Sequence, residues 1–171
     1  DLRANGGGQV SSSELLARHF IDKRRHVGYM SHKTGPGHND FSRQIPIYID
    51  PLTRGTIWLK PVFVLVNQGV YSAANDFVLR LKGLPHVRII GVKTGGGAGL
   101  PMSSELPNGW GIRFSASRTY DAAGKDVEFG IEPDIKVEGE LKRTDEKDLF
   151  IDASARLLTV WIKAIKKHLK K

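Results

Sequence analysis

The sequence has 171 residues, 40% of them apolar, and 26 Lys and Arg against 18 Asp and Glu give a net charge of +8. This length suits one globular domain with its own apolar core, and the absence of cysteine excludes a disulfide scaffold, a thiolate zinc site and a cysteine nucleophile. No apolar run approaches the ~20 residues that a membrane-spanning helix needs.

The chain opens in the middle of a structural pattern. Its first residues, DLRANGGG, are typical of the end of a strand that runs into a glycine turn. We therefore expect a piece of a longer protein, in which residues 1–171 form a single domain that is the C-terminal part of a larger one.

A helix and two extended segments are predicted next. Ser11 and Glu14 fit a capping box, and the apolar residues that follow at helical spacing predict a helix to about residue 22. Extended segments are predicted at residues 27–33 and 45–49, and the turn-forming segment between them, which includes residues 34–42, is either a loop or the tip of a long hairpin.

Two short apolar runs, residues 61–66 and 87–92, are rich in β-branched side chains. Such runs are typical of strands buried on both faces, as in a parallel sheet. The segment between them predicts a helix with one apolar face, formed by Ala74, Phe77, Val78 and Leu81. Two buried strands joined by a crossover helix make a βαβ unit, so the predicted fold class is α/β. Further strands are predicted at residues 110–114 and 131–137.

The segment 145–169 predicts an amphipathic helix that packs on the sheet through one apolar stripe. The stripe comprises Leu149, Ala153, Leu157, Val160, Trp161 and Ala164. Five lysines fall in the last nine residues, which is typical of a solvated helix end with cations at its C-terminus. A nucleic-acid-binding surface is the alternative for this charge, but it needs interleaved aromatics or a recognised motif, and neither is found.

Ser72 lies where the first buried strand gives way to a helix. At a helix N-terminus the free backbone N–H groups and the positive end of the dipole stabilise an oxyanion, so Ser72 is a candidate nucleophile. Serine is also a favoured N-cap, and the local sequence leaves both interpretations open.

Two glycine-rich segments are further candidates. Gly6, Gly7 and Gly8 follow a predicted strand. Their backbone N–H groups either bind an oxyanion or a phosphate, or the three glycines form a tight turn that binds no ligand. In the segment 93–99, KTGGGAG, the lysine precedes the glycines and no helix follows, so neither a P-loop nor a dinucleotide fingerprint is predicted. The six histidines lack metal-ligand spacing, so we expect no metal site and no cofactor.

Four segments together resemble a known family. They are DLRANGGG (1–8), NQGVYSAANDFV (67–78), IIGVKTGGGAGLP (89–101) and FGIEPDIKV (129–137). In this order and spacing they resemble the carboxyl-terminal processing (tail-specific) serine peptidases, in particular the tricorn-core-like branch. The resemblance implies a ClpP/crotonase-like α/β core and hydrolysis of peptide bonds.

The resemblance also implies roles for particular residues. The nucleophile of the family falls on Ser72, and its oxyanion donors fall on the amide of Ala73 and on that of Gly7, with Gly8 as the neighbour. The glutamate of the tricorn-like branch, which orients the base through an intermediary, falls on Glu128.

The general base is the point at which this sequence departs from the family. The lysine slot of the Ser–Lys branch falls on Gly97, and Lys93 stands at another register. The histidine of the tricorn-like branch comes from a segment before the first strand. We therefore expect the base to come from an upstream part of the same polypeptide, and this chain alone to lack full activity.

The expected partners are a peptide or protein substrate and that upstream part, with no nucleic acid and no membrane span; oligomer formation is left open. The alternative function is a non-catalytic peptide- or ligand-binding domain on the same fold, because fold does not fix function. The family resemblance favours a bacterial cell envelope location, although no targeting signal is recognised in the sequence.

Overall fold

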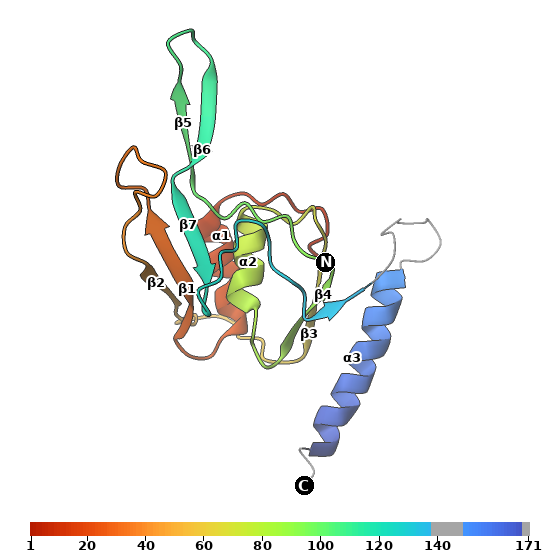
Figure 1. Cartoon of the computed structure of the whole chain (residues 1–171). Coiled ribbons are helices and arrows are strands. Elements are labelled where there is room, and N and C mark those ends of the chain that lie inside the picture. The colour runs from red at the N-terminus through yellow and green to blue at the C-terminus, as the bar shows by residue number, and fades with distance from the viewer. Residues whose placement is uncertain (138–148, 169–171) are drawn as a thin grey trace.

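A parallel βαβ unit forms the centre of the computed structural model, which describes residues 1–137 and 149–168 (Figure 1). Strand β3 (Val62–Val66) pairs in parallel with β4 (Val87–Gly91), and helix α2 (Ala73–Leu81) crosses over between them. The short strand β8 (Ile135–Lys136) extends this sheet beside β4. The predicted α/β class is confirmed, while the strand predicted at 131–137 is only two residues long.

The β3–β4 sheet is covered on both faces, as its continuous apolar runs predict. Val64 and Val66 face the main core beneath α2, whereas Leu65 belongs to a second apolar cluster on the opposite face. On that face the Trp161 ring of helix α3 (Leu149–His168) stacks on the ring of Phe63, with centroids 5.6 Å apart.

The contact of α3 is narrower than the predicted stripe. Leu157 and Val160 are 42% and 65% exposed. Of the stripe residues Leu157, Val160 and Trp161, it is therefore Trp161 that packs on the sheet. The burial of Leu149, Ala153 and Ala164, and the predicted helix residues 145–148 and 169, lie outside the described residues. In the described part of the chain, no helix is long and apolar enough to cross a membrane.

A second sheet lies across the helices from the first (Figure 1). Of the two alternatives left open for the segment between residues 33 and 45, the structure shows the hairpin: β1 (Arg25–His32) pairs antiparallel with β2 (Ile45–Ile49), and β7 (Ser117–Asp121) pairs with the other edge of β1. Helix α1 (Val10–Ala17), its 3₁₀ extension η1 (Arg18–Phe20) and α2 lie between the two sheets. The main core therefore joins residues of both sheets and both helices.

The capping box predicted for α1 is wrong. The helix begins at Val10 with Gln9 as its N-cap, and no side chain caps it, so Ser11 lies inside the first turn. The face of α1 that is buried carries the small residues Ser13 and Ala17. Small side chains there let α1 lie against α2, and the Ser13 hydroxyl donates a hydrogen bond to the Asp76 carboxylate.

An antiparallel ribbon projects from the rest of the molecule (Figure 1). It consists of β5 (Pro101–Glu105) and β6 (Gly111–Ser115), and every residue of both strands is exposed. Strand β6 matches the prediction for residues 110–114, whereas β5 and β7 were not predicted.

A buried polar network fixes the start of α2 to the loops around it. The Thr94 hydroxyl donates to Asn75 Oδ1 (2.6 Å) and accepts from the Ile131 amide (2.7 Å), and Asn75 is fully buried. This one hydroxyl joins α2, the glycine segment after β4 and the chain before β8, so it aligns the elements that surround Ser72.

Replacing Thr94 with valine is expected to lower the free energy of unfolding by about 2–3 kcal/mol, because the backbone amide of Ile131 and the side-chain oxygen Oδ1 of Asn75 both lose their hydrogen-bond partner. Urea unfolding followed by circular dichroism measures this. Thr94→Ser keeps the hydroxyl and is the matched control, for which we expect a clearly smaller loss. Equal losses in both variants would show that the methyl group, and not the hydrogen bonds, stabilises this region.

Candidate active site

Ser72 stands on a strained turn between β3 and α2. Its backbone adopts φ 55° and ψ −125°, one of two positive φ values among the non-glycine residues that the structure describes. The Ser72 amide donates to the carbonyl of Gly96 (2.8 Å), and the Tyr71 amide donates to the carbonyl of Asn5 (3.0 Å). These bonds hold a conformation that costs about 1–3 kcal/mol, and strain of this kind clusters at functional sites.

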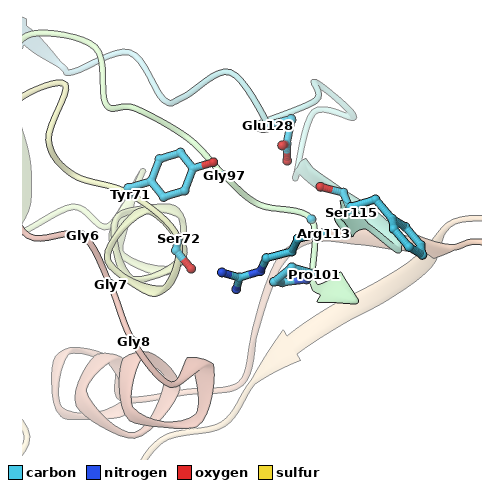
Figure 2. Close-up of a pocket in the computed structure, with 12 residues that line it drawn as sticks. Gly6, Gly7, Gly8, Tyr71, Ser72, Gly97, Pro101, Arg113, Ser115 and Glu128 are labelled. Atoms are coloured by element: carbon cyan, nitrogen blue, oxygen red, sulfur yellow. The ribbon is translucent and has the colours of Figure 1, made fainter. Parts of the chain in front are cut away.

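The hydroxyl of Ser72 is not used as a helix cap. Ser72 occupies the N-cap position of α2, but its side chain makes no capping hydrogen bond. Figure 2 shows the hydroxyl at the edge of a cleft beside the opening glycine loop. The structure therefore does not bear out the side-chain cap interpretation, and the hydroxyl is available to react.

The opening loop packs directly against this turn. The Leu2 amide donates to the carbonyl of Leu65, which places the first residues beside β3. Gly7 has φ +94°, and a Cβ there would lie 2.5 Å from the carbonyl oxygen of Tyr71 and 2.7 Å from the amide nitrogen of Ala73. Only glycine allows this approach of the two backbones.

The amides that are free at this junction differ in part from those that the resemblance implies. The Gly7 amide donates to Asn5 Oδ1 (2.9 Å), so it is already engaged. Within residues 1–137 and 149–168, no hydrogen-bond acceptor is found for the amides of Gly8 and Ala73. Both residues line the same hollow of about 320 Å³. Of Gly7, to which the resemblance assigns the loop donor, and its neighbour Gly8, it is therefore Gly8 that has a free amide.

The cleft beside Ser72 has a volume of about 560 Å³ (Figure 2). Its walls come from the opening loop, the turn at Ser72, the glycine segment after β4 and the β5–β6 ribbon. The lining side chains beyond Ser72 and the glycines are Tyr71, Pro101, Arg113, Phe114, Ser115 and Glu128.

Glu128 lies in the wall of this cleft, well separated from Ser72 (Figure 2). Its Oε2 accepts a hydrogen bond from the Ala98 amide (2.9 Å), and its backbone carbonyl accepts one from the Gly97 amide (2.8 Å). In this arrangement Glu128 holds the glycine segment in place.

Gly97, the position to which the resemblance assigns the lysine of the Ser–Lys branch, lies against the ring of Tyr71. Gly97 has φ +73°, and a Cβ added there would overlap the Tyr71 ring. Lys93 does not line the cleft. Of the side chains described, no histidine lines the cleft either, and no cluster of three His, Asp or Glu is arranged to hold a metal.

Arg113 is the main cleft residue that the sequence analysis missed. It comes from β6, far from Ser72 in sequence, and Figure 2 shows its side chain extending toward Ser72. The turn residues Pro107, Asn108 and Gly109 between two short runs are a hairpin signal that predicts the ribbon. Nothing in the sequence predicts which face of the ribbon is turned to the cleft.

Comparisons with known proteins identify the family to which the chain is similar. The model of Peptidase family S41 matches residues 1–137. The carboxy-terminal processing protease CtpA of Bacillus subtilis (strain 168) is 28% identical over 139 residues, which are 81% of this chain and 28% of that protein. The chloroplastic C-terminal processing peptidase of Tetradesmus obliquus is 29% identical over 146 residues, 85% of this chain and 29% of that protein.

Among solved structures, a protein of Parabacteroides merdae ATCC 43184 assigned as a peptidase superposes with a TM-score of 0.84 at 46% sequence identity. The match covers 91% of this chain and 50% of that one. The chain thus spans less than a third of the length of the two curated relatives and half of the solved structure.

Proposed function

The chain belongs to peptidase family S41, and on this premise we propose that it carries the nucleophile and the oxyanion site of a serine endopeptidase of the C-terminal processing type. The observation that carries the proposal is the backbone of Ser72. A serine held at positive φ, with its hydroxyl uncapped at the edge of a cleft, has a cost in stability that a purely structural residue does not need.

The chemistry is acyl transfer. Ser72 Oγ attacks the carbonyl carbon of the scissile peptide bond while a general base accepts its proton. The amides of Ala73 and Gly8 donate to the tetrahedral oxyanion, and each such donor contributes roughly 3 kcal/mol to transition-state stabilisation. The intermediate collapses by breaking the C–N bond, the amine leaves with a proton from the base, and water then hydrolyses the acyl-enzyme.

The general base is assigned to a part of the protein outside residues 1–171. Tyr71 fills the lysine slot at Gly97, which favours the arrangement of the tricorn-like branch, with a histidine from a preceding segment. Glu128 is assigned the orienting role of that branch. Its Oε2 is bound to the Ala98 amide, so Oε1 is the atom that would act through an intermediary.

A peptide-binding domain without catalysis is the second candidate function. It is favoured by one observation, the closed lysine slot, which leaves the described cleft without a lysine or histidine to accept the Ser72 proton. Such a domain would keep the cleft and its free amides but would not react with electrophiles directed at serine.

Labelling of the full-length protein with a fluorophosphonate separates the two candidates. We expect the wild type to be labelled and Ser72→Ala to lose the label. Ser115 lines the same cleft, so Ser115→Ala is the matched control and is expected to keep it. An unlabelled wild type that also cleaves no denatured protein would exclude the peptidase and leave the binding domain.

The substrate and location follow from the same proposal. The substrate is a peptide or an unfolded protein, since the cleft is open and large enough for an extended chain. Relatives from a bacterium and a chloroplast, both named as processing peptidases, support an exported or envelope location.

A further inference from the structure

Arg113 places an unneutralised positive charge in the cleft. Its side chain lines the cleft beside Ser72 and also an adjoining hollow of about 250 Å³ that Ser72 shares. In the part of the chain that the structure describes, the guanidinium makes no ion pair and no side-chain hydrogen bond. A cation kept free and aimed at a reactive serine needs an explanation.

On its own face of the ribbon, Arg113 has no acidic side chain as an ion-pair partner. Arg113 pairs with Ser103 across the ribbon, and Pro101 pairs with Ser115 two positions along on the same face. The acidic residue on that face, Glu105, pairs with Gly111 on the far side of Arg113 and makes no ion pair with it. The guanidinium is therefore left to a group that enters the cleft from outside.

Arg113 is unsuited to the proton transfer itself. A guanidinium stays protonated at any pH that a folded protein tolerates, so it cannot accept the proton of Ser72. Its planar fork is instead suited to binding a carboxylate through two parallel hydrogen bonds. Glu128, whose carboxylate lines the cleft, accepts a hydrogen bond from the Ala98 amide and lies away from Ser72 (Figure 2).

We propose that Arg113 determines substrate specificity by binding a carboxylate of the peptide next to the scissile bond. This inference rests on the proposed function and deepens it, because it names the substrate class as peptides with an acidic group held beside Ser72. That group is either an Asp or Glu side chain or the terminal carboxylate of the chain. Both present the same fork-shaped acceptor to the guanidinium.

The test uses the full-length protein and labelled decapeptide mixtures that are random except for one central residue, fixed as Glu, Gln or Lys. Each mixture is made with a free or an amidated C-terminus. We expect a preference of about 10-fold in kcat/KM for the mixtures with the bound carboxylate, mainly through KM. A preference for central Glu with an amidated end identifies a side chain, and one for the free end with central Gln identifies the terminus.

Variants of Arg113 make the test specific. Arg113→Gln is expected to abolish the preference, Arg113→Lys to retain part of it, and Arg113→Glu to reverse it toward central Lys. Lys125→Gln removes the same charge from an exposed turn outside the cleft and is the matched control, expected to behave as the wild type. An equal loss on every mixture in Arg113→Gln, or the absence of any preference in the wild type, overturns the proposal.

A binding measurement separates failure of this inference from failure of the proposed function. The same mixtures are titrated into Ser72→Ala protein, and fluorescence anisotropy reports binding without turnover. A preference that depends on Arg113 in this assay supports the carboxylate site even if no peptide is cleaved. Cleavage without any Arg113-dependent preference in binding or in KM leaves the peptidase standing and refutes the carboxylate site.

Discussion

Replacing Ser72 with alanine is expected to lower kcat for peptide hydrolysis by a factor on the order of 10⁴ or more, since removal of a catalytic serine leaves only the oxyanion site and substrate binding. Hydrolysis of a denatured protein by the full-length enzyme measures this. Because the amides of Ala73 and Gly8 remain in place, peptide affinity is expected to stay near the wild-type value. A variant with substantial residual activity would contradict the assignment of Ser72 as nucleophile.

The strained backbone of Ser72 also has a consequence for stability. Ser72 is held at φ 55°, a region that only glycine adopts without strain. Ser72→Gly is therefore expected to be more stable to unfolding than Ser72→Ala by about 1 kcal/mol, although both lack the hydroxyl. At an ordinary helix N-cap the Ser→Gly and Ser→Ala variants also differ in stability, but there the cause is backbone solvation and the residue is unstrained. Thermal unfolding is therefore interpreted together with a structure of each variant that reports φ at residue 72.

Replacing Gly7 with alanine is expected to lower kcat/KM by about 10²- to 10³-fold, the cost of one misplaced oxyanion donor. The new Cβ would lie 2.5 Å from the Tyr71 carbonyl oxygen and 2.7 Å from the Ala73 nitrogen, so the loop and the turn must separate. That separation displaces the amide of Gly8 relative to Ser72 and to the amide of Ala73. Kinetics on a peptide substrate, with folding checked by circular dichroism, measure the effect.

Gly6→Ala is the matched control for this result. It adds the same methyl group to the adjacent residue of the loop, and a Cβ there meets no atom within 4 Å. We expect kcat/KM close to that of the wild type. If both variants lose activity equally, the loop requires glycine for its freedom of movement and not for the close approach at Gly7.

The parts of the fold that the sequence predicts well are those buried on both sides. The run at residues 61–66 became β3, and α2 follows it with its predicted apolar face in the core. A strand that is buried on both faces needs an unbroken run of apolar and β-branched residues, and such a run can be recognised in the sequence. The position of Ser72 between these two elements could be predicted for the same reason.

The parts that the sequence predicts poorly have no such requirement. Every residue of β5 and β6 is exposed, so their strands show no alternation that a core would impose, and β5 went unnoticed. The approach of Arg113 to Ser72 depends on the orientation of the β5–β6 ribbon relative to the rest of the molecule, which no local sequence pattern predicts. Likewise, the capping box at Ser11 is a local pattern, and packing of α1 on α2 through small residues moved the helix start to Val10.

Backbone conformation at the site was also beyond the reach of sequence patterns. The positive φ of Ser72 and the hydrogen bond that occupies the Gly7 amide both depend on contacts between segments distant in sequence. Sequence resemblance placed the oxyanion donor at Gly7, and the hydrogen bond of that amide to Asn5 is what favours Gly8 instead.

The packing of the Tyr71 ring over Gly97 constrains how this active site can change in evolution. A lysine at position 97 meets the ring as long as Tyr71 is present, so that substitution alone is expected to be harmful. A lysine at position 97 is therefore expected to be tolerated better when a smaller residue replaces Tyr71, so the effects of substitutions at positions 71 and 97 are expected to depend on each other.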